Sequence, residues 1–155
     1  MKKVIFISST GGHLTELMQL KPLFNEYKSY IITENTKVNK DLKQKFKKID
    51  YLVYGTRKNL IKYFFIFFWN CALSFKYFLR FKPDYIVTTG AHTCVPMCFI
   101  AKLFRKKVIY IETFANSKTK SLSGKIIYPI ADLFLVQWES MLKLYPKSKY
   151  VGGLF

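Results

Sequence analysis

Acidic residues are scarce in this sequence of 155 residues, which contains 9 Asp and Glu against 26 Lys and Arg. The resulting net charge of +17 at pH 7 indicates a polyanionic partner, such as nucleic acid, an anionic membrane surface or a phosphorylated substrate. Histidine and cysteine are also scarce, with two and three residues, and their positions lack the spacing of metal ligands. The sequence therefore predicts no metal site.

Two phosphate-binding motifs are missing from the sequence. It contains neither a G-x-x-x-x-G-K-S/T loop nor the dinucleotide motif G-x-G-x-x-G, which removes support for nucleotide hydrolysis and for dinucleotide oxidoreduction. We therefore expect no bound cofactor. The sequence also lacks a signal peptide, and its cysteines are odd in number, so a reducing cytosol is expected. With no linker or repeat, residues 1–155 are predicted to form a single domain.

Hydrophobic residues make up half of the chain, and their pattern predicts strands that alternate with helices. Strands are predicted at residues 4–7, 29–33, 51–54, 84–88, 107–111, 133–136 and 149–151. Helices are predicted at residues 14–20, 38–48, 59–81, 95–103 and 123–131, with Pro22 ending or disturbing the first of them. Such alternation is typical of right-handed crossovers and a parallel sheet. The predicted fold class is α/β, a Rossmann-like parallel sheet with flanking helices.

Aromatic residues, 18% of the chain, concentrate in the predicted helix at residues 59–81. From Tyr63 to Phe75 this segment carries no charge, and it is flanked by lysines and arginines: Lys58, Lys62, Lys76, Arg80 and Lys82. The uncharged run is shorter than the roughly 20 residues that cross a bilayer. Two interpretations remain open. Either the helix is buried in the core, or it also enters a membrane interface. The candidate membrane-associating residues are Phe64, Phe65, Phe67, Phe68 and Trp69.

Three polar loops follow predicted strands, at residues 8–13, 88–93 and 112–117. Ligands of open parallel sheets bind at the carboxyl ends of the strands, so we expect these loops to form one site. Glycines allow a close backbone approach, and a helix N-terminus attracts anions, although turn glycines are also common for steric reasons alone. A histidine at a helix start, such as His13, is suited to act as a neutral base. The other candidate binding residues are Ser9, Thr10, Gly11, Gly12, Gly90, Ala91, His92, Thr93, Glu112, Thr113, Asn116 and Ser117.

The runs Ile5–His13, Thr89–His92 and Ile111–Thr113 resemble a group of bacterial capsular and exopolysaccharide proteins. These are related to the membrane-anchoring subunit of the eukaryotic dolichol-linked N-acetylglucosaminyltransferase. More distantly, the runs resemble the N-terminal half of the lipid II-forming peptidoglycan glycosyltransferase. The resemblance extends nearly from Met1 to Phe155. It implies the acceptor half of a GT-B glycosyltransferase, which holds a polyprenyl-diphosphate-linked acceptor while a separate chain holds the nucleotide sugar.

The resemblance also implies roles for individual residues. Gly11, Gly12 and His13 would face the diphosphate or the reacting hydroxyl of the acceptor, with His13 as general base. Gly90, Ala91, His92 and Thr93 would form a second wall, and Glu112 and Asn116 would contact the acceptor sugar. The segment Val151–Phe155 resembles the point at which single-chain relatives continue into a donor domain, where this sequence ends.

Membrane attachment is where the sequence departs from the eukaryotic subunit. That subunit has an N-terminal transmembrane anchor, whereas only Lys2 and Lys3 separate Met1 from the predicted first strand. We expect the aromatic helix and its basic flanks to replace the anchor, and so to hold the protein at the cytoplasmic face of the cell membrane. The expected partners are thus a donor-binding subunit, the lipid-linked acceptor and an anionic membrane surface.

Two other functions remain as alternatives. The basic clusters Lys43–Lys48 and Arg105–Lys107 are compatible with nucleic-acid binding, but no recognition helix or aromatic RNA-binding motif accompanies them. We therefore expect no nucleic-acid partner. A self-sufficient small glycosyltransferase is the second alternative. It is disfavoured because one Rossmann-like domain offers one ligand crevice, whereas sugar transfer needs sites for donor and acceptor.

Overall fold

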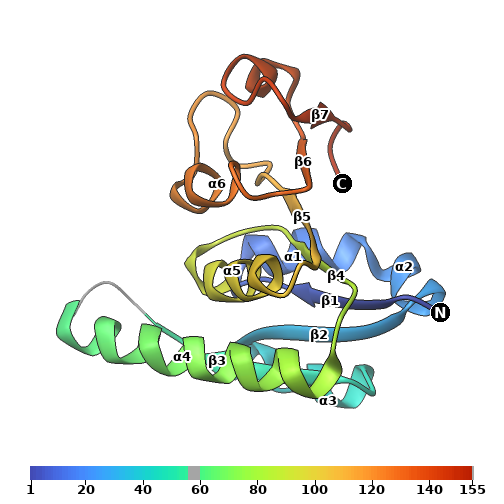
Figure 1. Ribbon diagram of the computed structural model, residues 1–155, viewed down its shortest axis with the longest axis vertical. Coiled ribbons are helices and arrows are strands. Elements are labelled where there is room, and N and C mark those ends of the chain that lie inside the picture. Colours follow the sequence, from blue (N-terminus) through green and yellow to red (C-terminus); the bar gives the residue numbers. More distant parts are fainter. Residues whose placement is uncertain (56–59, 155) are drawn as a thin grey trace.

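The computed structural model describes residues 1–55 and 60–154, and its described strands form one seven-stranded parallel sheet (Figure 1). The strands are β1 (Lys3–Ile7), β2 (Lys28–Asn35), β3 (Ile49–Val53), β4 (Tyr85–Thr88), β5 (Lys107–Ile111), β6 (Leu133–Val136) and β7 (Lys149–Tyr150). Their order is β3-β2-β1-β4-β5-β6-β7, and each neighbouring pair is parallel. The predicted Rossmann-like fold class is confirmed. The order reverses between β1 and β4, where ligands of such sheets bind.

Helices cover both faces of the sheet. The α-helices are α1 (Gly12–Gln19), α2 (Lys21–Glu26), α3 (Leu42–Lys45), α4 (Leu60–Phe81), α5 (Val95–Leu103) and α6 (Leu122–Ile127), and the 3-10 turns are η1 (Lys37–Asn39), η2 (His92–Cys94) and η3 (Glu139–Lys143). Alternate residues of β1 point to opposite faces, as a strand requires. Ile5 and Ile7 pack in the core beneath α4, α5 and α6, whereas Val4 and Phe6 pack beneath α1 and α2.

Two predicted helices are shorter than expected, and a further short helix, α2, follows α1. The predicted basic helix at 38–48 is wrong: only η1 and the short α3 form there, because lysines dominate this segment and few apolar side chains can pack it. Helix α6 ends at Ile127 rather than near residue 131, because Pro129 cannot continue a helix. Helix α1 ends at Gln19, before Pro22, and Pro22 lies in the first turn of α2, where proline is tolerated. The predicted start at Asn59 and the flanking Lys58 lie outside the described residues.

Helix α4 is fastened to the edge strand β3 by polar side chains on one of its faces. The Asn70 amide donates to the carbonyl of Val53 and accepts from its N–H group, both at 2.8 Å. The Tyr77 hydroxyl donates to the carbonyl of Tyr51 at 2.9 Å, and Arg80 pairs with Asp50. The single amide in the uncharged run thus acts as a hydrogen-bonding partner for the edge strand.

Anchoring of this face leaves aromatic rings exposed on the other side of α4. Phe64, Phe65, Phe68 and Trp69 are 58%, 69%, 56% and 61% exposed, whereas Phe67 is half-buried. Figure 1 shows α4 running alongside β2 and β3, with its N-terminal half extending beyond the sheet. Within residues 1–55 and 60–154, no helix combines the length and the apolar character that crossing a membrane requires. A contiguous exposed group of rings of this kind is typical of an interaction surface.

Candidate functional site

The three polar loops come together at the carboxyl edge of β1, β4 and β5. The His13 carbonyl, at the start of α1, accepts a 2.6 Å hydrogen bond from the hydroxyl of Thr89, in the loop after β4. The loop after β5 contacts α1 through Thr113. These contacts join segments that are far apart in the chain but adjacent in the sheet order. The three loops are thus joined next to the switch between β1 and β4.

Backbone geometry in the loop after β4 is unusual at two consecutive residues. Gly90 has a φ of 105°, and a Cβ atom there would lie 2.7 Å from the Tyr110 hydroxyl and 3.5 Å from Cε1 of His13. Glycine is therefore required at this position because of the positive φ and the clash with the Tyr110 hydroxyl, whereas 3.5 Å from His13 is an ordinary contact distance. Ala91 has φ 71° and ψ 167°, a conformation that costs a residue with a side chain about 1–3 kcal/mol. Backbone strain of this kind is typical of active sites and ligand-binding loops.

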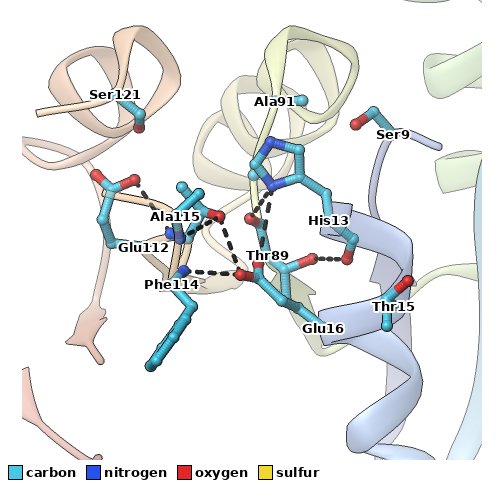
Figure 2. Close-up of polar contacts among 12 residues, drawn as sticks. Ser9, His13, Thr15, Glu16, Thr89, Ala91, Glu112, Phe114, Ala115 and Ser121 are labelled. Carbon is cyan, nitrogen blue, oxygen red and sulfur yellow. Dashed lines mark hydrogen bonds and ion pairs between the residues drawn. The ribbon is translucent and has the colours of Figure 1, made fainter. Parts of the chain in front are cut away.

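His13 is oriented by acceptors on one side of its ring. Its Nδ1 lies 2.8 Å from the Thr89 carbonyl oxygen and 3.9 Å from Oε2 of Glu16. A carbonyl can only accept, so in the neutral ring Nδ1 carries the proton and Nε2 keeps a lone pair. Figure 2 shows the ring with Thr89 and Glu16 on one side and Ala91 on the other. The side chain is 27% exposed, so it is accessible to a ligand.

Glu16 is a site residue that sequence reasoning missed. It is 3% exposed, and its Oε1 accepts from the Thr113 hydroxyl at 2.9 Å and from the Phe114 N–H at 2.7 Å. Its Oε2 makes no hydrogen bond within the described part of the chain. The carboxylate thus ties α1 to the loop after β5 and lies beside His13. Its spacing from His13, three residues along a helix, was the available signal.

Glu34, near the end of β2, is the second site residue that sequence reasoning missed. Like Glu16, it holds separate segments of the site together through hydrogen bonds to its carboxylate. It is 2% exposed, and its carboxylate accepts from the Thr10 N–H at 3.1 Å and from the Thr93 hydroxyl at 2.6 Å. Nε2 of His92 lies 4.0 Å from the same carboxylate. Glu34 therefore joins the loop after β1 to the loop after β4. The sequence did contain a signal for this role, because Glu34 is an acidic residue that directly follows the strand predicted at residues 29–33.

Glu112, predicted to contact an acceptor sugar, is engaged inside the protein. It is 1% exposed, and its Oε2 accepts a 2.7 Å hydrogen bond from the Tyr145 hydroxyl. Burial, and then the nearby Glu112 carboxylate, raise the pKa of Tyr145, so its phenol stays protonated and donates. Burial likewise raises the pKa of Tyr110, whose hydroxyl lies 2.9 Å from that of Ser123. A contact between Glu112 and a sugar stays a prediction.

The remaining predicted residues lie along the same loops. Ser9 is buried, and Gly11 has a positive φ of 75° directly before α1. Asn116 closes the turn that begins at Thr113, with its N–H donating to the Thr113 carbonyl at 3.1 Å, and the Ser117 carbonyl accepts from Ser140 of η3 at 2.5 Å. The contact with Ser140 thus places Ser117 beside η3.

A pocket of about 370 Å³ opens beside the two histidines. It is lined by His13, Tyr63, Phe67, Ala91, His92, Val95, Ser121, Leu122, Ser123 and Ile126. The ring centroids of Tyr63 and His92 are 5.3 Å apart. Sequence reasoning placed the histidines here but did not include the residues of α4, α5 and α6. These come from distant segments and carry no motif of their own.

Comparison with known proteins identifies related sequences. The model of the family described as "Oligosaccharide biosynthesis protein Alg14 like" matches residues 3–154. The mouse protein named UDP-N-acetylglucosamine transferase subunit ALG14 is 32% identical over an alignment 179 residues long, gaps included. The alignment covers 98% of this chain and 82% of the mouse protein. The human protein of the same name is 31% identical, with 97% and 82% covered.

Solved structures share the fold at low sequence identity. MurG of Acinetobacter baumannii superimposes with a TM-score of 0.79 at 17% identity, covering 99% of this chain and 46% of MurG. UDP-GlcNAc 2-epimerase of Methanocaldococcus jannaschii superimposes with a TM-score of 0.72 at 17% identity, covering 97% of this chain and 45% of the epimerase. The chain thus spans somewhat less than half of each of these proteins. It corresponds to the Rossmann-like N-terminal half of a GT-B fold.

Replacement of Glu16 tests its part in assembling the site. Glu16→Ala should lower the free energy of unfolding by about 2–3 kcal/mol, because the Phe114 N–H and the Thr113 hydroxyl lose a charged acceptor in a buried place. Glu16→Gln keeps an acceptor oxygen and should cost about 1 kcal/mol. Urea unfolding followed by circular dichroism measures both, with the exposed Glu26→Ala as control. Equal stability of Glu16→Ala and the wild type would contradict the assignment.

Proposed function

Because this chain belongs to the family of Alg14-like oligosaccharide biosynthesis proteins, we propose that it is the acceptor-binding, membrane-recruiting subunit of a two-chain glycosyltransferase. In this proposal, the complex transfers a sugar from a nucleotide sugar to a polyprenyl-diphosphate-linked saccharide. The relatives named as UDP-N-acetylglucosamine transferase subunits support this substrate class. The resemblance of the three loops to bacterial capsular proteins supports surface polysaccharide assembly as the setting.

The observation that carries the proposal is the orientation of His13. Thr89 holds Nδ1 at 2.8 Å, which leaves Nε2 as the proton acceptor beside the pocket that His13 lines together with His92 and residues of α4, α5 and α6. A general base requires such a lone pair within reach of the proton that it removes. The carboxylate of Glu16 lies on the same side of the ring as Thr89, 3.9 Å from Nδ1, and leaves Nε2 open to the ligand.

The proposed reaction uses this lone pair in one displacement. A hydroxyl of the acceptor saccharide gives its proton to Nε2 of His13, and its oxygen attacks the anomeric carbon of the nucleotide sugar. A new C–O bond forms, and the bond to the nucleoside diphosphate breaks, with the electron pair leaving on that group. The donor-binding chain stabilises the leaving diphosphate. The loops of Ser9–Gly12, Gly90–Thr93 and Glu112–Ser117 position the acceptor.

Membrane recruitment is proposed to use the exposed rings of α4, namely Phe64, Phe65, Phe68 and Trp69. Aromatic rings partition into the lipid interface, and the surplus of Lys and Arg, a net charge of +17, attracts anionic headgroups. The rings lie on the helix that also contributes Tyr63 and Phe67 to the pocket beside His13. A protein held in this way would meet a lipid-linked acceptor at the cytoplasmic face of the cell membrane.

A reconstitution assay tests whether sugar transfer requires a second, donor-binding chain. We expect no sugar transfer from UDP-N-acetylglucosamine to a polyprenyl-diphosphate-linked saccharide with this chain alone, because one crevice cannot hold donor and acceptor together. Transfer should appear when a donor-binding partner chain is added, and product chromatography measures it. Full activity of this chain by itself would refute the two-chain proposal.

Substitution of the two histidines separates the base from a binding residue. In the reconstituted pair, His13→Ala should lower kcat by about a hundredfold or more, because the proton acceptor is lost. His92→Ala should mainly raise the KM for the acceptor and so serves as the matched control. Steady-state kinetics at varied acceptor concentration distinguishes the two patterns. A His13→Ala enzyme with unchanged kcat and a raised KM would exclude a base.

Vesicle binding tests the role of the rings. The variant with Phe64, Phe65, Phe68 and Trp69 changed to Ser should lose most co-sedimentation with phosphatidylglycerol vesicles at low salt, since its apolar contact with the interface is removed. A variant with the exposed Val38, Tyr150 and Val151 changed to Ser is the control and should sediment like the wild type. Equal sedimentation of both variants, or no binding by the wild type, would overturn the recruitment proposal.

A further inference from the structure

The pocket beside the histidines has a lining of two chemical kinds. His13, Tyr63, His92, Ser121 and Ser123 supply polar groups. Phe67, Val95, Leu122 and Ile126 supply side chains without hydrogen-bonding groups. Among the described residues that line the pocket, none is Lys, Arg, Asp or Glu. The pocket is therefore suited to a ligand with a polar head and an uncharged, apolar continuation.

The apolar residues of the lining are connected to the exposed rings of α4. They come from α4, α5 and α6, and Leu122 and Ile126 of α6 are 53% and 38% exposed. Phe67 packs edge-on against Phe68, with ring centroids 5.9 Å apart, and Phe68 belongs to the exposed ring group. An apolar chain that leaves the pocket along Phe67 thus reaches the surface proposed to contact the membrane.

We propose that this pocket binds the first isoprene units of the acceptor lipid, next to its diphosphate; this inference rests on the function proposed above. A volume of about 370 Å³ lies at the small end of ligand pockets, which suits a few isoprene units rather than a whole lipid-linked saccharide. Each buried methylene strengthens binding roughly fourfold. The pocket therefore makes the enzyme recognise the prenyl chain as well as the sugar.

A sugar or a nucleobase fits the apolar residues of the lining less well. Either would bring several hydroxyl or ring-nitrogen groups against Phe67, Val95, Leu122 and Ile126, which cannot pair with them. A hydrocarbon needs no such partners. The polar lining residues, such as His92 and Ser121, remain available for the groups that join the prenyl chain to the saccharide.

Titration calorimetry with farnesyl diphosphate, below its aggregation concentration, tests the proposal on the full chain. We expect the wild type to bind farnesyl diphosphate at least about tenfold more tightly than inorganic pyrophosphate, because the prenyl group buries several methylenes. The double variant Leu122→Gln/Ile126→Gln should bind farnesyl diphosphate about tenfold more weakly and pyrophosphate as the wild type does. Both side chains lie at the surface, so the fold should tolerate the change.

Leu103→Gln is the matched control, since Leu103 is 79% exposed on α5 and does not line the pocket. It should bind both probes like the wild type. The proposal is overturned if the wild type does not prefer the prenylated probe, or if the double variant loses both probes equally. Tighter binding of an unprenylated N-acetylglucosamine diphosphate than of farnesyl diphosphate would assign the pocket to the sugar instead.

Sugar transfer by the reconstituted pair separates this proposal from the function on which it rests. With an acceptor whose prenyl chain is replaced by a methyl group, the wild type and the double variant should transfer at equal rates. With a prenylated acceptor, the KM of the double variant should rise about tenfold. Absence of any transfer by the wild type would overturn the proposed function, whereas the calorimetric result would still decide what the pocket binds.

Discussion

Two buried carboxylates hold the three polar loops of this protein in one place. Glu34 accepts hydrogen bonds from Thr10 and Thr93, and so joins the first loop to the second. Glu16 accepts from Thr113 and Phe114, and so joins α1 to the third. A buried carboxylate is costly unless donors surround it, so these bonds restrict the loops to arrangements that supply such donors. The orientation of His13 follows from that restriction.

The second organising feature is the attachment of α4 to the edge strand. Asn70 and Tyr77 bind the backbone of β3, which determines the rotation of the helix about its axis. That rotation turns four rings outward and turns Tyr63 and Phe67 towards the pocket beside the histidines. One helix thus connects the proposed membrane surface with the proposed acceptor site. Membrane recruitment and acceptor binding, the two proposed roles, therefore both depend on the attachment of α4 to β3.

Much of the fold was predictable because a parallel sheet has a strong local signature. Strands buried on both faces appear as short apolar runs, and the runs at residues 4–7, 107–111 and 133–136 correspond closely to β1, β5 and β6. The helix predicted at 38–48 failed because its spacing of apolar residues was too sparse to bury a face. Polar loops after strands were equally visible, and the structure joins these loops through hydrogen bonds at the carboxyl edge of the sheet. The side chains that hold those loops together, Glu16 and Glu34, were not recognisable from the sequence.

The sequence by itself determined the order of strands and helices, the position of the polar loops and the concentration of rings in one helix. These are properties of neighbouring residues, and periodicity and run length reveal them. Only the tertiary structure decided that Glu16 and Glu34 support the site, that Glu112 turns towards Tyr145, and which rings stay outside. These outcomes depend on contacts such as those of His13 with Thr89, 76 residues away, and of Glu16 with Phe114, 98 residues away. Local pattern carries no information about which distant group will satisfy a buried charge.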